Sequence, residues 1–369
     1  ENFTGYHRVN GIFAQQALPL IDSDDMIWVH DYHLIPMGEE LRRMGVTQPM
    51  GFFLHTPLPS LEVLATLPSH ERLLRALCAY DVIGFQTEND LRAFHEYITV
   101  EARGRIFSDG LVEAFGRMIR AQVFPIGIEA DAMAEHARKA NRLASVRRLK
   151  KALGERKLMI GVDRLDYSKG IQNRFEGFER FLDKYPDWQR GVEFLQIAPP
   201  SRADVPEYME IRRSLETEAG HLNGRFAAID WTPLHYVNQG FNRNTLTGFF
   251  RNSQVGMVTP LRDGMNLVAK EYVASQDPKD PGVLVLSRFA GAARELGTAL
   301  IVNPYDRDSL ADAIRRALEM PLGERKERWQ EAMRVIRANS LTNWRESFLG
   351  VLRRAPFTSP HVANHDHQP

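Results

Sequence analysis

Short runs of β-branched and aromatic residues alternate with amphipathic stretches along the chain. The runs have the length of buried strands, and the stretches between them repeat apolar residues at helical spacing. This alternation predicts parallel β-α-β units and an α/β fold. The predicted strands are Met26–His30, Met50–His55, Asp81–Phe85, Ala121–Phe124, Leu158–Val162, Val192–Ala198, Ala227–Ile229, Val255–Thr259, Val283–Ser287 and Ala299–Val302.

The stretches between the strands predict amphipathic helices. Within Arg174–Lys184, the aromatic residues Phe175, Phe178 and Phe181 share one helical face. A helical pattern also opens the chain, with apolar residues at Val9, Ile12, Phe13 and Leu18. The other predicted helices are Ala130–Leu153, Glu207–Ala219, Ser309–Met320, Glu324–Ala338 and Leu341–Arg353.

The length of 369 residues exceeds the size at which a single core stops growing, so we expect two domains. The boundary is expected where a strand ends in Pro125 and Gly127 before a charged helix. The expected domains are residues 1–126 and 127–335. Residues 336–354 are expected to form a helix that crosses back to the first domain, and the Pro- and His-rich tail 355–369 is expected to be disordered.

Composition excludes several classes of protein. Lys and Arg total 47, as do Asp and Glu, which argues against nucleic acid or an anionic membrane as the main partner. The sequence contains neither a long apolar run nor a signal segment, and its single cysteine, Cys78, favours a reducing, cytoplasmic setting. Because the chain opens at Glu1 within a helical pattern, we expect an upstream part of the first domain to be missing.

Polar clusters follow the first two predicted strands, at His30-Asp31-Tyr32-His33 and at His55-Thr56. Ligands of open α/β sheets bind beyond the carboxyl ends of strands, so Asp31 and His55 are candidates for contacts with ligand hydroxyls. Capping of the following helix is the competing interpretation of either cluster alone. The presence of both slightly favours a binding site.

A basic loop follows the strand Leu158–Val162, with Arg164 and Lys169 five residues apart. A guanidinium fork and a lysine point charge can hold a diphosphate from two sides. Pairing of Arg164 with a neighbouring aspartate on the surface explains the loop about as well. A further basic residue, Arg202, follows the strand Val192–Ala198.

The segment from Thr259 to Glu271 is the most informative. A strand, a turn at Asp263-Gly264 and a helix starting near Asn266 would leave backbone N–H groups directed at a phosphate. Asp263 can accept from sugar hydroxyls, and Glu271 can chelate a ribose diol. An ordinary helix cap is the competing interpretation of the Asp263-Gly264 pair. It does not explain why two basic loops are expected at the same edge of the sheet, so we favour a binding site. The usual dinucleotide and P-loop signatures are missing from the sequence, and the DxD pairs at Asp22 and Asp306 are interpreted as turns and caps, so we expect no catalytic metal.

Three segments together resemble the trehalose-phosphate synthase family of retaining glucosyltransferases. They are His30-Asp31-Tyr32-His33-Leu34, Arg164-Leu165-Asp166-Tyr167-Ser168-Lys169-Gly170 and Arg262-Asp263-Gly264-Met265-Asn266-Leu267-Val268-Ala269-Lys270-Glu271. The resemblance runs from about Tyr6 to Arg353. It implies two facing Rossmann-like domains of the glycosyltransferase-B architecture with a cleft between them. It also implies transfer of glucose from UDP-glucose to glucose 6-phosphate, giving α,α-trehalose 6-phosphate and UDP.

The resemblance also implies roles for matching residues. Arg164 and Lys169 would hold the diphosphate, and Arg202 would bind the acceptor phosphate. Asp263 would grip the donor sugar, and Asp31 and His55 would contact the sugars. Glu271 would bind the ribose, Phe241 would lie beside the uracil, and main-chain N–H groups would come from Gly264, Met265, Asn266, Leu267 and Val268. No cofactor is implied, because UDP-glucose is a co-substrate.

Other functions stay open from the sequence alone. A related synthase could use another phosphorylated acceptor, such as glycerol 3-phosphate, or another nucleotide donor. A non-catalytic sugar-phosphate-binding homologue is the alternative from a different class, although intact Arg164, Lys169, Asp263 and Glu271 argue against it. A homo-oligomer is compatible with the sequence.

Overall fold

The computed structural model describes residues 2–201 and 205–357. The chain divides into two compact units, one of residues 1–126 with 342–369 and the other of residues 127–341. The chain therefore passes from unit 1 to unit 2 at Ile126–Gly127 and returns at Leu341–Thr342.

Unit 1 is built on a six-stranded sheet in the order β1-β2-β3-β6-β5-β4. Its first four strands are parallel, and the last two form an antiparallel edge. The strands are β1 (Ile27–His30), β2 (Met50–Phe53), β3 (Val82–Phe85), β4 (Arg105–Ile106), β5 (Leu111–Ala114) and β6 (Arg117–Val123). The helices of the first segment are α1 (Asn2–Ala17), α2 (Met37–Arg43), α3 (Leu61–Leu64), α4 (His70–Leu77) and α5 (Glu88–Val100), with short 3₁₀ turns η1 (Leu18–Leu20) and η2 (Tyr32–Leu34).

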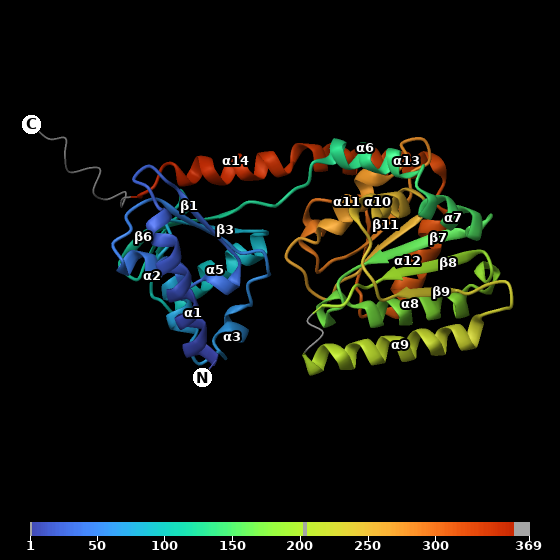
Figure 1. Ribbon diagram of the computed structural model, residues 1–369, viewed down its shortest axis with the longest axis horizontal. Coiled ribbons are helices and arrows are strands. Elements are labelled where there is room, and N and C mark those ends of the chain that lie inside the picture. The colour runs from blue at the N-terminus through green and yellow to red at the C-terminus, as the bar shows by residue number, and fades with distance from the viewer. Residues whose placement is uncertain (1, 202–204, 358–369) are drawn as a thin grey trace, which may run out of the picture. The chain divides into compact units, whose positions relative to one another are not determined.

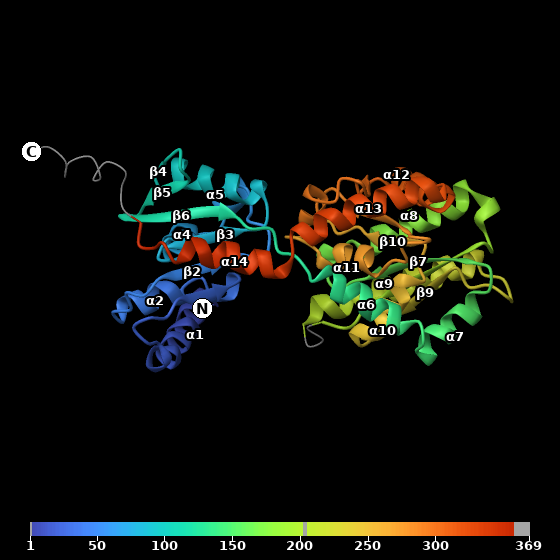
Figure 2. The same cartoon turned by 90° about the horizontal axis from the view of Figure 1, so that it is seen from above.

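Both faces of this sheet are buried, as expected for parallel strands. Each face of the sheet packs against its own hydrophobic core. In β2, Phe52 belongs to the core on one face and the next residue, Phe53, to the core on the other. The second core is closed by α14 (Leu341–Leu352), which lies along the sheet in Figures 1 and 2. A Cβ at Gly51 would lie 2.5 Å from the Phe348 ring, so glycine there lets the helix approach the sheet closely.

The opening helix forms as predicted, but its apolar pattern does not face the core. Val9, Ile12 and Phe13 are 46%, 52% and 52% exposed, whereas Asn10 and Ala14 are buried. The packed face of α1 therefore carries polar as well as apolar residues.

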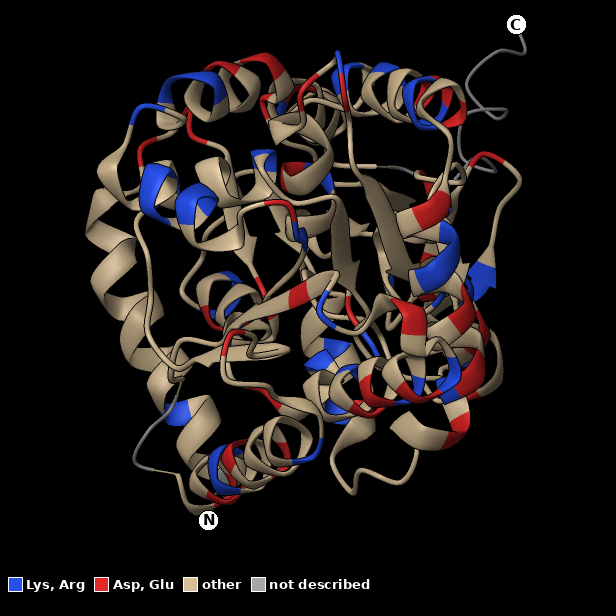
Figure 3. Ribbon diagram, turned by 90° about the vertical axis from the view of Figure 1, so that its right-hand side faces the viewer, with Lys and Arg blue, Asp and Glu red and all other residues tan. Residues whose placement is uncertain are grey.

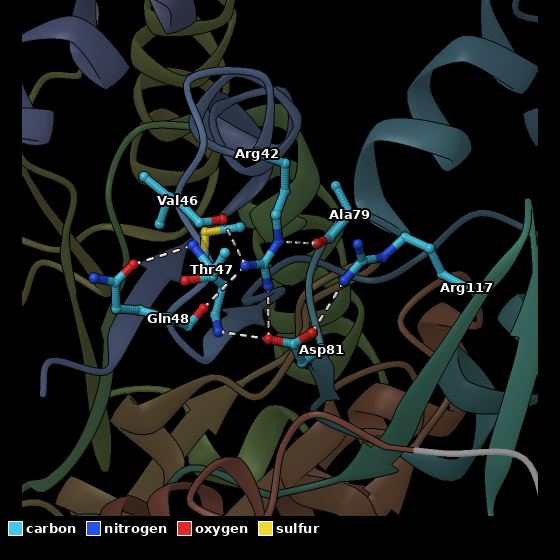
Figure 4. Close-up of polar contacts among 8 residues, drawn as sticks. Arg42, Val46, Thr47, Gln48, Ala79, Asp81 and Arg117 are labelled. Atoms are coloured by element: carbon cyan, nitrogen blue, oxygen red, sulfur yellow. Dashed lines mark hydrogen bonds and ion pairs between the residues drawn. The ribbon is translucent and has the colours of Figure 1, made fainter. Parts of the chain in front are cut away.

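A buried carboxylate holds the amino-terminal ends of the unit 1 strands together (Figure 4). Asp81 precedes β3, and its Oδ2 accepts hydrogen bonds from Arg42 Nη2 at 2.7 Å and from the Met50 N–H at 2.8 Å. Its Oδ1 accepts from Arg117 Nη2 at 3.0 Å. Arg42 also donates to the carbonyls of Val46 and Gln48. This cluster lies at the opposite sheet edge from the carboxyl ends of the strands, where ligands are expected.

Unit 2 contains a six-stranded parallel sheet in the order β12-β11-β10-β7-β8-β9. Its strands are β7 (Lys157–Val162), β8 (Val192–Ile197), β9 (Leu234–Val237), β10 (Val255–Val258), β11 (Val283–Ser287) and β12 (Leu300–Val302). Figure 1 shows α8 and α9 on one side of this sheet and α10 and α11 on the other. Its helices are α6 (Ala130–Ala140), α7 (Ala144–Leu153), α8 (Ile171–Lys184), α9 (Pro206–Phe226), α10 (Arg243–Arg251), α11 (Leu267–Ser275), α12 (Arg307–Glu319) and α13 (Leu322–Ala338), with 3₁₀ turns η3 (Tyr167–Lys169), η4 (Pro186–Trp188) and η5 (Gly291–Arg294).

The structure differs from the predicted elements in three places. The strand expected at Ala227–Ile229 is a turn with Ile229 fully exposed, and the edge strand is β9 instead. The helix expected over Ala130–Leu153 breaks into α6 and α7. The antiparallel strands β4 and β5 were not predicted, because they are short and joined through a turn at Gly110, whose φ is 84°.

Charged residues of both signs alternate along the helices, while the strands carry few of them (Figure 3). Basic and acidic residues, 47 of each in the neutral chain, are thus interspersed along the helices seen in this view. Within residues 2–201 and 205–357, every helix is too short or too polar to cross a bilayer.

Candidate functional site

Two loops of unit 2 meet at the carboxyl ends of β7 and β10. Lys169 lies in the loop after β7 and Asp263 in the loop after β10, and Lys169 Nζ is 2.6 Å from Asp263 Oδ2. Because β7 and β10 are neighbours in the sheet, their carboxyl ends bring these loops together. Both side chains are mostly buried, with 16% and 17% exposed. The structure thus places an ion pair at the edge where ligands of such sheets bind.

Local sequence explains the shape of the Lys169 loop. The Asp166 carboxylate accepts from the backbone N–H and the hydroxyl of Ser168, which forms the turn η3. Gly170 follows with a φ of 63°, and a Cβ there would lie 2.6 Å from the carbonyl oxygen of Thr259. The Ser168 carbonyl in turn accepts from the Leu261 N–H at 2.8 Å. The two loops are therefore joined through their backbones as well as through Lys169 and Asp263.

The turn before α11 has a strained backbone. Asn266 has a φ of 68° in the left-handed region, and its Nδ2 donates to Asp263 Oδ2 at 3.0 Å. Such a conformation costs about 1–3 kcal/mol and tends to occur at functional sites. The N–H groups at the start of a helix lack an intrahelical partner, so those of Leu267 and Val268 are suited to an anion.

The loop that follows β11 holds this turn through backbone hydrogen bonds. The N–H groups of Gly291 and Ala292 donate to the carbonyls of Asp263 and Met265 at 3.2 and 2.8 Å. A Cβ at Gly291 would lie 1.8 Å from the Gly264 carbonyl oxygen. The backbone from Asp263 to Met265 is therefore held by the loop that follows β11.

The remaining unit 2 candidates lie on neighbouring elements. Glu271 is on α11, and burial raises the pKa of its carboxyl group while Arg243 of α10 opposes the shift. Phe241 precedes α10 and packs edge-on against Phe249, with ring centroids 5.4 Å apart. Arg164 follows β7 and is exposed. Arg202 lies outside the described residues.

Asp31 and His55 come together in unit 1, at the carboxyl ends of β1 and β2. Asp31 Oδ1 accepts from the His55 N–H at 3.3 Å. Asp31 also has a φ of 70° and a ψ of 161°, a conformation nearly restricted to glycine that costs about 1–3 kcal/mol. Because strain of this kind tends to occur at functional sites, it supports Asp31 as a candidate functional residue.

A pair of histidines lies beside Asp31. His30 Nδ1 is 3.1 Å from His55 Nε2, and their rings stack with centroids 5.3 Å apart. Burial and the neighbouring His55 lower the pKa of His30 to about 4, and burial lowers the pKa of His55 while Asp31 opposes that shift. Trp344 of α14 covers both imidazoles, with ring centroids 6.1 and 6.3 Å away. The pair is therefore neutral near pH 7, with one imidazole donating and the other accepting.

Sequence reasoning missed two buried ion pairs next to the unit 2 site. Arg174 of α8 lies beneath the Lys169 loop and pairs with Asp163 at 2.7 Å. Lys270, inside the segment singled out from the sequence, is buried and has its Nζ 2.5 Å from Glu295 Oε2. An arginine on a helix and a lysine in a motif are both expected to be exposed, so the sequence carried little signal for either.

The described residues contain no group of three or more His, Cys, Asp or Glu side chains placed to hold a metal ion. Asp306 caps α12 by accepting from the Ser309 N–H at 3.0 Å, as its sequence position predicted.

Each unit is thus a Rossmann-like α/β domain, with polar side chains gathered at the carboxyl ends of its parallel strands. This is the construction of nucleotide-dependent glycosyltransferases of the B architecture. The sequence model of Glycosyltransferase family 20 matches residues 1–354. The chain belongs to that family.

Similar proteins include a trehalose-6-phosphate synthase of Enterobacter sp. (strain 638). It is 51% identical over 354 residues, which cover 96% of this chain and 74% of the relative. Among solved structures, an α,α-trehalose-phosphate synthase (UDP-forming) from Burkholderia xenovorans in complex with glucose-6-phosphate has a TM-score of 0.94 and 53% identity, covering 95% of this chain and 78% of that one. A trehalose-6-phosphate protein from E. coli bound with UDP-2-fluoro glucose has a TM-score of 0.94 and 50% identity, covering 96% and 78%.

Proposed function

We propose that this protein transfers glucose from UDP-glucose to glucose 6-phosphate, giving α,α-trehalose 6-phosphate and UDP with retention at the anomeric carbon. The observation that carries the proposal is the Lys169–Asp263 pair beside the amino terminus of α11. Family membership supports it, since one similar structure holds glucose-6-phosphate and another a fluorinated UDP-glucose.

Unit 2 binds the donor in this proposal. The diphosphate lies against Lys169, Arg164 and the N–H groups of Leu267 and Val268. Glu271 accepts from the ribose hydroxyls and Phe241 lies beside the uracil. Asp263 accepts from glucose hydroxyls, with the backbone of Gly264, Met265 and Asn266 beside it.

The Lys169–Asp263 contact suggests how the donor is received. Each charge neutralises the other in this contact, which limits the cost of their partial burial. When the donor binds, Lys169 turns to the diphosphate and Asp263 to the sugar, so each charged group exchanges one partner for another. The substrate therefore meets charged groups that are already largely desolvated.

In this proposal, Asp31 and His55 of unit 1 contact the sugars. The strained backbone of Asp31 fixes its carboxylate, which also accepts from the His55 N–H. A neutral His55 can donate or accept one hydrogen bond without adding charge. Arg202, outside the described residues, is assigned to the acceptor phosphate.

Charge stabilisation dominates the proposed mechanism. As the glycosidic bond breaks, negative charge develops on the departing diphosphate, where two cations and helix-end N–H groups offset it. The acceptor hydroxyl attacks from the same face, and the departing phosphate takes its proton, so the anomeric configuration is retained. The proposal includes no metal cofactor. The buried free thiol of Cys78 fits a reducing, cytoplasmic setting.

The test is an assay of UDP release from UDP-glucose with glucose 6-phosphate or glycerol 3-phosphate as acceptor. We expect release with glucose 6-phosphate and a product whose NMR spectrum shows two α-linked anomeric protons. Faster release with glycerol 3-phosphate would identify a synthase for another acceptor. UDP binding without turnover of either acceptor would identify a non-catalytic homologue.

A further inference from the structure

Arg174 is a fully buried arginine in the first turns of α8, directly beneath the candidate donor site. Its exposed fraction is 0%, although it lies on an amphipathic helix where arginine is normally at the surface. Burying a guanidinium is costly unless its charge is paired and its N–H groups are bonded. Its partners therefore indicate what it does.

The guanidinium bonds to elements that carry the two site loops. Nη1 donates to Asp163 Oδ2 at 2.7 Å and to Gln196 Oε1 at 2.8 Å, at the ends of β7 and β8. Nε donates to Thr259 Oγ1 at 2.9 Å, at the end of β10, where the Asp263 loop begins. Nη2 donates to the carbonyl oxygen of Lys169 itself at 3.3 Å. One rigid side chain thus contacts the starting points of both loops and one of the site residues.

The surrounding sequence accommodates this side chain. Gly161 of β7 leaves room for it, because a Cβ there would lie 2.6 Å from Arg174 Nη1 and 2.3 Å from Gln196 Oε1. Asp163 supplies the compensating charge from a fully buried position. Burial raises the pKa of Asp163, while Arg174 and Lys169 oppose that shift, so the carboxylate is electrically coupled to the site above it.

We propose that Arg174 is a positioning residue that holds the Lys169 and Asp263 loops in the register needed to bind and release the donor diphosphate. The inference rests on the proposed function and deepens it. Only an arginine has donors in a planar fork that reach Thr259, Asp163 and Lys169 together, and lysine offers a single ammonium group. A misplacement of about 1 Å at a reacting group can lower turnover about 100-fold.

The test is a double-mutant cycle between Arg174→Met and Lys169→Ala. We expect kcat of Arg174→Met to fall 10- to 100-fold, measured well below its melting temperature. Because Arg174 acts in part through Lys169, the loss of kcat in the double variant should be smaller than the product of the two single losses. A purely structural role would lower the melting temperature and leave the kcat of folded enzyme unchanged, or would give losses that multiply in the double variant, and either result would overturn the proposal.

Arg180→Met is the matched control, since Arg180 lies on the same helix and pairs with Asp308 at the surface. It should keep the turnover of the wild type. Arg174→Lys preserves the charge and serves if the methionine variant does not fold, and we expect about a tenfold loss of kcat. Wild-type kcat in that variant would also refute the proposal.

UDP affinity, measured by calorimetry on the same variants of the full chain, separates this inference from the proposed function. If the wild type released no UDP with either acceptor, the proposed function would fail, while binding would still decide the role of Arg174. Weaker UDP binding in Arg174→Met that is not additive with Lys169→Ala supports the positioning role. Unchanged or additive binding argues against it.

Discussion

Asp263 and Lys169 are separated by 94 residues, yet their carboxylate and ammonium groups lie 2.6 Å apart. The contact joins the loops that follow two neighbouring strands, β7 and β10. It places one cation and one anion side by side at the edge where the donor is proposed to bind.

Lys169→Ala should lower kcat sharply with little change in fold. The variant removes a fixed cation from the departing diphosphate, and loss of one such group commonly costs about 3 kcal/mol, or ~100-fold in rate. Steady-state UDP release and circular dichroism together check this. Lys151→Ala, at an exposed position of α7, is the control and should behave as the wild type. Near-normal turnover in folded Lys169→Ala would refute the assigned role.

Gly291→Ala should damage the donor site through the backbone. The new Cβ would lie 1.8 Å from the Gly264 carbonyl oxygen, so the loop that carries Asp263 must move. We expect UDP-glucose turnover to fall about tenfold or more. Gly297→Ala meets no atom within 4 Å and is the matched control. Equal activities of the two variants would contradict the close packing described above.

The histidine pair predicts how stability depends on pH. The pKa of His30 is about 4 in the folded protein and 6.5 as its ordinary value, so unfolding takes up a proton between these limits. The contribution of neutral His30 to the free energy of unfolding is therefore fully present above pH 6.5. It declines as the pH falls from 6.5 towards 4. Melting temperatures of His30→Gln should depend less on pH in this window than those of the wild type.

His136→Gln serves as the control for this prediction, because His136 is exposed on α6. Its melting temperature should follow the wild-type pH dependence. A His30→Gln variant with an unchanged slope would show that His30 is not held neutral by the fold.

Asp81→Ala should destabilise the protein without touching the donor site. The variant leaves the guanidinium groups of Arg42 and Arg117 without their shared carboxylate, and breaking such a buried pair costs about 3 kcal/mol. Chemical denaturation measures this loss. Glu71→Ala removes an exposed pair with Arg75 and should cost below about 1 kcal/mol. A similar loss in both variants would mean that the Asp81 cluster contributes no more than a surface ion pair.

Much of the fold was predictable because buried parallel strands have a clear sequence pattern. β7, β8, β10 and β11 are mostly apolar and almost entirely buried, and they were located to within a residue or two. The edge strand β9 was misplaced, because its sequence is half polar and an apolar Ile229 nearby is exposed in a turn. Edge positions lack the two-sided burial that makes inner strands recognisable.

The candidate site was predictable in part, because positions after strands are where ligands bind in this type of sheet. Lys169, Asp263 and Asp31 were selected on that ground, and the structure pairs the first two and places the third beside His55. The role of Arg174 had no such signal. An arginine in an amphipathic helix looks the same in sequence whether it faces solvent or a buried carboxylate.

The sequence by itself determined the succession of strands and helices, the polar loops at strand ends and the family resemblance, because each depends on residues close together along the chain. The tertiary structure alone decided which loops meet. The order of strands places β7 beside β10, and this adjacency creates the Lys169–Asp263 contact and the buried Arg174 beneath it. Contacts between distant segments depend on which strands become neighbours, and the local sequence pattern does not specify that.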